Sequence, residues 1–262
     1  MKIIILILIG GYVIASMLLY LLQERFIFLG EPLDRDHQFK FDIPHTELYI
    51  DMKDGGMINV LQFKAESSKG LILYYHGNAG NLAGWGFVAQ DFVSLGYDVA
   101  ILDYRGYGKS TGKRTEKTIL SDAVAVYDHF INEYPEDMII LYGRSLGTGI
   151  AAYAGSRRNP AKIILETPYY TFTSLVQAHV PVFPAAPSLK FKFNTHRYLK
   201  EVRCPVYIFH GTEDSVVPFK QGNRLYKSLD PENAFMYIIK GGTHNDLSNY
   251  KEYWDNLERV LQ

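Results

Sequence analysis

The chain has 262 residues, a length at which α/β proteins commonly form one domain around one core. It carries 27 basic and 28 acidic residues, a net charge of −1, and 47% of its residues are hydrophobic. This balance argues against a nucleic-acid-binding surface and against a disordered chain. The single cysteine, Cys204, excludes an intramolecular disulfide and a cysteine cluster for zinc, and we expect it to be a small buried hydrophobe.

The first segment is uncharged from Ile3 to Leu22. A helix of about twenty residues spans about 30 Å, the thickness of a bilayer core. We therefore expect residues 1–22 to be a membrane anchor helix of a single-pass protein. A cleaved signal peptide is the alternative, because small or medium residues precede Ser16, but the apolar run continues beyond that point and favours an uncleaved anchor.

The orientation of this anchor depends on few charges. Lys2 and the amino terminus lie on one side, and Arg25 and Arg35 lie on the other. The positive-inside rule slightly favours an extracytoplasmic main domain.

Beyond a linker expected over residues 23–45, the main domain of residues 46–262 alternates short apolar runs with helix-like periodicity. Runs that are continuously apolar are typical of strands buried on both faces of a parallel sheet, and their alternation with helices indicates an α/β fold with helices on both sides. The first two runs, joined by Asp54–Gly56, predict a hairpin. The expected strands are Leu48–Met52, Met57–Lys64, Leu71–Tyr75, Asp98–Leu102, Met138–Tyr142, Lys162–Leu165, Val206–Phe209 and Phe235–Ile239.

The clearest expected helix covers Thr115–Tyr134, where apolar residues recur at three- and four-residue spacing. Others should follow Ser145, cover Phe219–Leu229 and cover Asp246–Leu261, the last with Asp246 as its N-cap. The alternation breaks over residues 167–203, an aromatic segment with four prolines (Pro168, Pro181, Pro184 and Pro187). A long insertion of this kind usually forms a lid or a binding element.

The stretch LYGRSLGTG places Ser145 between Gly143 and Gly147. A serine hydroxyl is a poor nucleophile at neutral pH, so it needs a nearby base and a position clear of the backbone. The G-x-S-x-G pattern, after an apolar run and before a segment of small residues, is typical of a strained strand-to-helix turn that exposes the serine. We predict that Ser145 is a nucleophile; a plain glycine-rich turn is the alternative.

A base and an acid for this serine are expected later in the chain. His244 in KGGTHND follows the last expected strand, at the edge of the sheet where ligands gather in open α/β folds. HGTEDSVVP supplies Asp214 just after the preceding strand, with Glu213 as a competing acid and His210 in the role of capping a turn. The order Ser145, Asp214, His244 is that of a nucleophile, acid and base placed at strand ends.

Acyl transfer also needs hydrogen-bond donors for the developing oxyanion. The loop YYHGNAGN follows the Leu71–Tyr75 strand, and its glycines, Gly77 among them, let backbone amides turn inward. The N–H groups of Asn78 and Leu146 are the expected pair of donors. His76 then has the structural role of fixing the loop.

The run DYRGYGKSTG ends like a phosphate-binding P-loop, but that pattern requires a glycine where this chain has Asp103. We interpret it as a tight loop in which Asp103 and Arg105 pair locally and which forms one side of the pocket. No metal or organic cofactor is implied.

With these residues assembled, the chain resembles the α/β-hydrolases, and within them the membrane-anchored abhydrolase-domain serine hydrolases that include depalmitoylase-like and lysophospholipase-like members. The resemblance rests on HGNAGN, LDYRGYGKSTG, YGRSLGTG, LETPYY, HGTEDSVVP and GGTHND, and it extends from about Gln23 to the C-terminus. It implies a mostly parallel eight-stranded sheet and catalytic roles for Ser145, Asp214 and His244. The insertion after Glu166 is its variable part, so the resemblance is weakest for the identity of the substrate.

The expected activity is hydrolysis of carboxylic esters or thioesters through an acyl-enzyme. The anchor and the apolar insertion suggest a small-molecule or lipid acyl ester that partitions into the bilayer, and Lys190, Lys192, Arg197 and Lys200, near Phe191 and Phe193, could meet anionic headgroups. A solvated surface with a few tucked aromatics is an equal alternative for this basic flank. A serine peptidase of the same fold and an inactive binding module are the competing functions.

Overall fold

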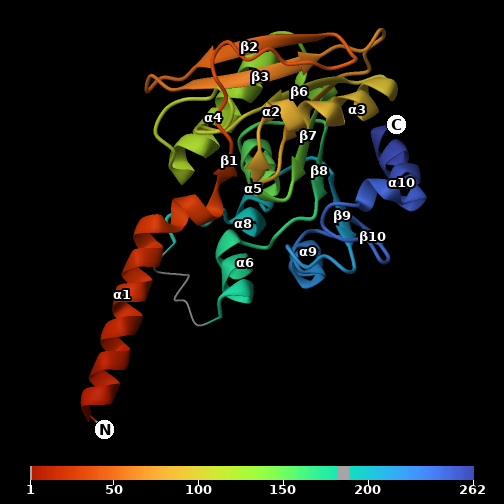
Figure 1. Cartoon of the computed structure of the whole chain (residues 1–262). Helices are drawn as coiled ribbons and strands as arrows, with labels where there is room; N and C mark the ends of the chain where they lie inside the picture. Colours follow the sequence, from red (N-terminus) through yellow and green to blue (C-terminus); the bar gives the residue numbers. More distant parts are fainter. Residues whose placement is uncertain (1, 182–188) are drawn as a thin grey trace.

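The computed structural model describes residues 2–181 and 189–262. Pro184 and Pro187 of the expected lid lie outside the described residues. The main body is one α/β sandwich, and a long N-terminal helix projects from it (Figure 1).

The centre of the body is an eight-stranded sheet with the order β10–β9–β8–β7–β4–β6–β3–β2. Neighbouring strands are parallel except around β3, which runs antiparallel to both β2 and β6. The mostly parallel sheet and the opening hairpin are thus confirmed. The strands are β2 (His45–Asp51), β3 (Met57–Phe63), β4 (Leu71–Tyr75), β6 (Asp98–Leu102), β7 (Ile139–Arg144), β8 (Lys162–Glu166), β9 (Val206–Gly211) and β10 (Ala234–Ile239).

The register aligns the carboxyl ends of the central strands. Tyr75, the last residue of β4, pairs with Leu102 of β6 and with Gly143 of β7. Because all three strands end at the same level, the loops that follow them meet at one edge of the sheet. The predicted site residues lie in these loops and in those after β9 and β10.

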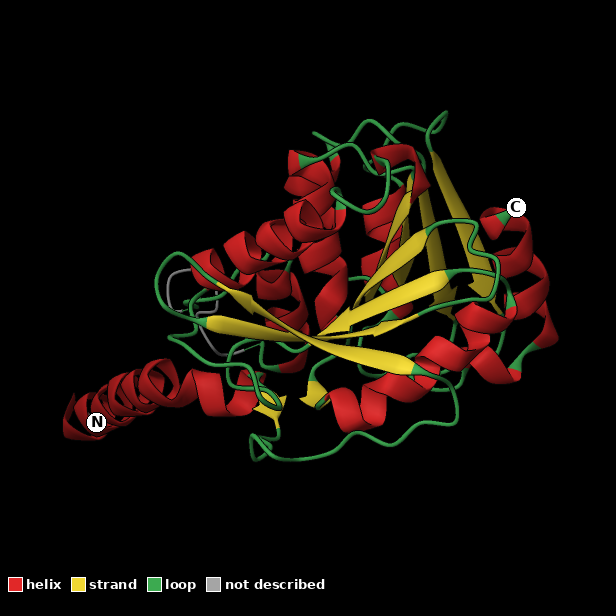
Figure 2. Cartoon of the chain, turned by 90° about the horizontal axis from the view of Figure 1, so that it is seen from above, coloured by secondary structure: helices red, strands yellow, loops and turns green. Residues whose placement is uncertain are grey.

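Helices cover both faces of the sheet (Figure 2). Side chains alternate along β4, so Leu73 packs against the face of α4 and α5 while Ile72 packs against the face of α3 and α10. The described residues of the main body form the helices α2 (Leu82–Trp85), α3 (Ala89–Ser94), α4 (Glu116–Phe130), α5 (Leu146–Arg157), α6 (Phe172–His179), α8 (Thr195–Leu199), α9 (Phe219–Tyr226) and α10 (Lys251–Leu261).

The start of the last helix differs from the prediction. A separate turn of 3₁₀ helix, Leu247–Asn249, comes first, and α10 begins only at Lys251. Asp246 does not cap α10, because its carboxylate instead accepts a hydrogen bond from the backbone N–H of Thr243 at 2.6 Å. The Asp246 carboxylate therefore stabilises the loop that carries His244.

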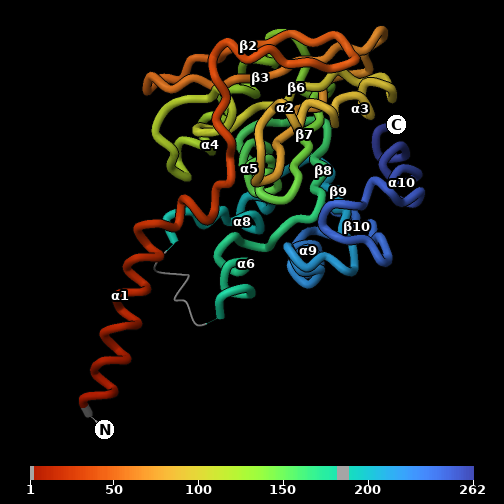
Figure 3. The backbone as a smooth tube through the Cα atoms, viewed as in Figure 1, coloured from red at the N-terminus to blue at the C-terminus, as the bar shows by residue number. Residues whose placement is uncertain are grey.

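The N-terminal helix α1 covers Lys2–Ile27 and is long and apolar enough to cross a membrane. It extends away from the body over most of its length (Figure 3). Its end is held, since Ile27 and the following Phe28 are buried in the core. The next residues form β1 (Leu29–Gly30), which pairs in parallel with β5 (Ala79–Gly80) in a small second sheet. The segment predicted as a linker thus packs on the main domain.

In the described part of the insertion after β8 lie the helices α6 and α8. Phe191 and Phe193 are buried at 1% and 0% exposure, so the aromatics of the expected basic flank belong to the core. Lys190 pairs with Glu24 of α1 at 3.5 Å. The insertion is therefore connected to the N-terminal helix.

Candidate active site

Ser145 lies at a sharp turn between β7 and α5. Its φ of 51° and ψ of −114° are strained for a residue with a side chain. The turn is held by the backbone N–H of Ser145, which donates to the carbonyl oxygen of Glu166 at 2.9 Å. Gly147 is required here, because an added Cβ would lie 1.9 Å from the carbonyl oxygen of Tyr75. Gly143 is similarly crowded by the backbone of α5.

Three side chains from three loops form one hydrogen-bonded chain. His244 Nε2 lies 3.0 Å from Ser145 Oγ, and His244 Nδ1 lies 2.8 Å from Asp214 Oδ2. With the proton of the neutral imidazole on Nδ1, Nε2 is free to accept the proton of Ser145. The structure brings together the predicted nucleophile, base and acid.

Asp214 is buried, and its environment favours the carboxylate. Burial alone raises the pKa of Asp214, but hydrogen bonds from His210, His244 and the backbone of Val217 outweigh it and hold this pKa well below its usual value. His210 Nε2 lies 3.5 Å from Asp214 Oδ2 and 2.8 Å from the carbonyl oxygen of Val217. His210 therefore closes the turn, as expected, and also contacts the acid.

The predicted oxyanion loop lies beside the serine turn. Asn78 and Leu146 line the same cavity as Ser145, and among the described residues neither backbone N–H has a hydrogen-bond acceptor. Tyr107 fixes the loop from behind, since its hydroxyl donates to the carbonyl oxygen of Asn78 at 2.7 Å. Gly77 leaves room for the ring of Trp85, which would lie only 3.1 Å from a Cβ atom added at position 77.

His76 is fully buried and fixes this loop, as expected for a structural residue. Its Nε2 lies 3.1 Å from Asp103 Oδ1, and Asp103 Oδ2 accepts from the N–H of Leu82 at 3.1 Å. The expected local pairing of Asp103 with Arg105 is wrong, because Arg105 binds Asp54 and Asp122 instead. Asp103, Tyr104 and Tyr107 contact the oxyanion loop. The expectation that their loop forms one side of the pocket is wrong, because none of residues 103–112 lines the cavity.

Sequence reasoning missed an ionic network that lies beneath the serine turn. Arg144 Nε lies 3.1 Å from Glu166 Oε1, and the buried Glu166 also accepts hydrogen bonds from Tyr142 and Tyr253. The same arginine donates to the carbonyl oxygen of His244 at 3.4 Å. In the sequence, the signal for this network was a charged residue at the end of each of two apolar runs. These residues are Arg144 in GRSLG and Glu166 in LETPYY.

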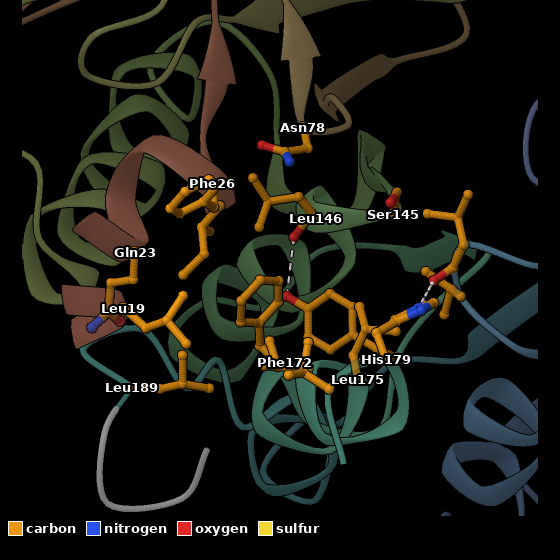
Figure 4. Close-up of a pocket in the computed structure, with 16 residues that line it drawn as sticks. Leu19, Gln23, Phe26, Asn78, Ser145, Leu146, Phe172, Leu175, His179 and Leu189 are labelled. Atoms are coloured by element: carbon orange, nitrogen blue, oxygen red, sulfur yellow. Dashed lines mark hydrogen bonds between the residues drawn. The ribbon is translucent and has the colours of Figure 1, made fainter. Parts of the chain in front are cut away.

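The serine opens into a cavity of about 470 Å³, within the range of small-molecule sites. Ser145, Asn78 and Leu146 lie at one side, while α1 and α6 contribute the other walls (Figure 4). Most lining side chains are apolar, and none of the lining residues that the structure describes is acidic. The cavity therefore suits an uncharged, largely apolar ligand. The residues contributed by α1 and α6 are Leu19, Gln23, Phe26, Ile27, Phe172, Leu175, Val176 and His179.

The sheet order, the strained serine at the end of β7 and the three-residue chain of hydrogen bonds define the α/β-hydrolase class of proteins. Solved structures agree with this fold. An esterase of Pyrococcus furiosus superposes with a TM-score of 0.70 at 17% identity, covering 89% of this chain and 97% of that one. An acylaminoacyl peptidase of Pyrococcus horikoshii has a TM-score of 0.62 at 17% identity, covering 86% of this chain and 41% of that one.

The sequence comparisons are more specific. The family model described as serine aminopeptidase, S33, matches residues 66–193. The lysophosphatidylserine lipase ABHD12 of Macaca fascicularis is 34% identical over 189 residues, and the match covers 64% of this chain and 48% of that protein. The α/β-hydrolase domain-containing protein aho-3 of Caenorhabditis elegans is 31% identical over 198 residues, 72% of this chain and 57% of that one. The chain is thus similar in sequence to abhydrolase-domain α/β-hydrolases and spans about half the length of these curated relatives.

Proposed function

We propose that this protein is a membrane-anchored serine hydrolase that cleaves carboxylic esters or thioesters of lipid or acylated substrates. The observation that carries the proposal is the unbroken chain of hydrogen bonds from Ser145 through His244 to Asp214, which opens into an apolar cavity. The likeness to the lysophosphatidylserine lipase and to the esterase fold supports the same chemistry.

In the first half of the reaction, Ser145 Oγ attacks the carbonyl carbon while His244 Nε2 takes its proton. Asp214, held as a carboxylate, keeps the other imidazole proton on Nδ1 and stabilises the imidazolium. The negative charge that develops on the carbonyl oxygen is stabilised by the N–H groups of Asn78 and Leu146. Collapse of the intermediate expels the alcohol or thiol, which receives the proton from His244, and leaves an acyl group on Ser145.

In the second half, water replaces the leaving group. His244 removes a proton from the water as its oxygen attacks the acyl carbon, and the same two N–H groups stabilise the second oxyanion. Ser145 leaves with the proton from His244, and the carboxylic acid is released. The three side chains and two amides that act here all belong to this chain, so the proposed cycle needs no further reactant than water.

The substrate class follows from the cavity and the anchor. The apolar walls of the cavity favour binding of an acyl chain, because each buried methylene contributes about 0.8 kcal/mol to binding. We therefore propose substrates that reside in the bilayer, such as a lysophospholipid, a monoacylglycerol or an acylated protein. In this proposal α1 crosses the membrane once and the hydrolase domain lies on its extracytoplasmic side, the orientation that the flanking charges favour.

A peptidase is the second candidate, because the matching family model is described as an aminopeptidase. An aminopeptidase needs an acidic group that binds the substrate amine. The described lining residues of the cavity offer none, so we favour ester or thioester cleavage.

The proposal is tested by labelling the full chain in lipid nanodiscs with an alkyl fluorophosphonate and locating the adduct by mass spectrometry. We expect one adduct, on Ser145, and a fall of about 10⁴-fold or more in ester turnover for Ser145→Ala. Ser121→Ala, a serine on the exposed surface of α4, is the matched control. An unlabelled Ser145, or a Ser145→Ala variant that keeps more than a few per cent of the turnover, would contradict the proposal and favour a binding module.

A further inference from the structure

The N-terminal helix forms one wall of the cavity that contains Ser145. Leu19, Gln23, Phe26 and Ile27 all line this cavity. Their spacing of four, three and one residues places them on one face of the helix, and they span about 12 Å along its axis. In Figure 4 this face lies across the cavity from Ser145, and the side chains of α6 lie below it.

The same face reaches into the part of α1 that is expected to lie in the bilayer. The uncharged run ends at Leu22, and Glu24 and Arg25 follow it. Leu19 is three residues before the end of this run, which is about 4.5 Å along a helix. The wall therefore begins at the level of the lipid tails and ends, at Ile27, inside the protein core.

The end of α1 is fixed relative to the serine by several contacts. Gln23 is buried, and its side-chain oxygen accepts a hydrogen bond from the backbone N–H of Lys190 at 2.8 Å. Phe28 packs edge-on against Phe191, with ring centroids 4.6 Å apart. The N–H of Leu29 then donates to the side chain of Asn78 at 3.3 Å. These contacts position the helix face as part of the site.

We propose that α1 is a component of the acyl-binding site as well as an anchor. The acyl chain of the substrate lies against Leu19 and Phe26, with its tail directed along α1 towards the bilayer while its carbonyl group reaches Ser145. An acyl chain is the occupant that fits, because the cavity is apolar, contains Ser145 and reaches the level of the lipid tails. This inference rests on the proposed hydrolase function.

This role of α1 is tested by measuring kcat/KM for a series of monoacylglycerols of increasing acyl-chain length, in wild type and in two matched variants. In nanodiscs, we expect kcat/KM for monoacylglycerols to rise by up to about fourfold per methylene until the cavity is filled, which corresponds to about 0.8 kcal/mol. Leu19→Trp narrows the cavity, so the ratio of long-chain to short-chain kcat/KM should fall at least tenfold. Leu21→Trp places the same ring on the opposite face of α1, outside the cavity, and should keep the wild-type ratio.

A direct measurement keeps the inference testable if Leu19→Trp folds poorly. A long-chain fluorophosphonate with a diazirine near the end of its alkyl tail is attached to Ser145 and then irradiated. We expect cross-links to the α1 peptide that contains residues 19–27. Cross-links found only in other segments would overturn the role of α1.

The outcomes separate this inference from the function on which it rests. Failure of the fluorophosphonate to label wild-type Ser145 refutes the hydrolase function, and with it the proposed role of α1 in acyl binding. Suppose instead that Ser145 is labelled and that the ratio of long-chain to short-chain kcat/KM is equal in wild type, Leu19→Trp and Leu21→Trp. This result leaves the hydrolase function intact and overturns only the role of α1 in acyl binding.

Discussion

The guanidinium group of Arg144 donates a hydrogen bond to the backbone carbonyl oxygen of His244 at 3.4 Å. Arg144 directly precedes Ser145, so one side chain connects the turn of the nucleophile to the loop of the base. Glu166 holds the guanidinium from the other side at 3.1 Å, and Trp85 lies beneath it with its ring centroid 5.4 Å away. This geometry makes Arg144 a positioning residue for the triad.

We expect Arg144→Met to lower both stability and turnover. The substitution leaves the buried Glu166 without its cation, a change that typically costs about 3–5 kcal/mol of unfolding free energy. It also releases the loop of His244, so kcat should fall more than KM rises. Thermal unfolding and steady-state kinetics measure the two effects.

Arg157→Met is the control, because Arg157 pairs with Glu201 at the exposed surface. Exposed pairs contribute about 0–1 kcal/mol, so this variant should resemble wild type. Equal behaviour of the two variants would exclude the positioning role of Arg144.

Gly147→Ala should prevent correct assembly of the serine turn. The new methyl group would lie 1.9 Å from the carbonyl oxygen of Tyr75 and 2.8 Å from that of His76, and both are backbone atoms that cannot move aside. Overpacking of this kind costs about 1–3 kcal/mol or more, and the shift of β4 against α5 should abolish labelling of Ser145.

The matched control for this change is Gly84→Ala in α2. An added Cβ there has no neighbour within 4 Å, and alanine favours helix over glycine. We expect unchanged or slightly higher melting temperature and full labelling. A Gly147→Ala protein that labels at the wild-type rate would show that the turn tolerates a side chain.

Tyr107→Phe tests the support of the oxyanion loop. The Tyr107 hydroxyl donates to the backbone oxygen of Asn78 and lies 2.8 Å from its side-chain oxygen. Without it the Asn78 N–H is less well positioned, and we expect kcat to fall about tenfold, less than the 10²–10³ for outright loss of a donor. Tyr226→Phe, on α9 and away from the cavity, should have no effect. A fall in turnover that comes from KM alone would argue against this role of Tyr107.

Acid should destabilise the protein partly through Asp214. The folded state holds the pKa of this carboxyl below its unfolded value of about 3.9. Its contribution to stability is therefore fully present above that value and is lost as the pH falls towards the folded pKa. Asp214→Asn should lower stability at pH 7, and its difference from wild type should shrink below about pH 4.

Urea titrations between pH 3 and pH 7 measure the unfolding free energies of wild type and Asp214→Asn, and hence the difference between them at each pH. Asp255→Asn removes an exposed carboxylate that pairs with Lys251, and it should change stability little at any pH in this range. A difference between wild type and Asp214→Asn that stays constant with pH would contradict the linkage.

Much of the fold was predictable because its signals are local. Each strand is a short apolar run, and the hairpin turn Asp54–Gly56 is explicit in the sequence. The residues that assemble at the site were also predictable, because Ser145, Asp214 and His244 each follow a strand, and the ends of parallel strands meet at one edge.

The remainder depends on contacts between distant segments, which no local pattern encodes. Arg105 has one carboxylate in its own loop, Asp103, yet it binds Asp54 from the hairpin and Asp122 from α4. The pairing of β1 with β5 joins two-residue strands separated by almost fifty positions, too short to have a periodicity. The packing of α1 against the cavity is likewise visible only once the insertion and the helix are placed together.

The pairing of β1 with β5 has a practical consequence for anyone who wants a water-soluble form of this protein. Deleting only the hydrophobic run, up to Leu22, would leave Phe26 exposed at a new amino terminus and keep Ile27 and Phe28 in the core. Deleting the whole stretch up to His45 would remove those core residues and the strand beside the Asn78 loop. A cut after Leu22 therefore keeps the strand that supports the oxyanion loop, a cut at His45 loses it, and only the intact chain in detergent or nanodiscs keeps the part of α1 that lines the cavity as well.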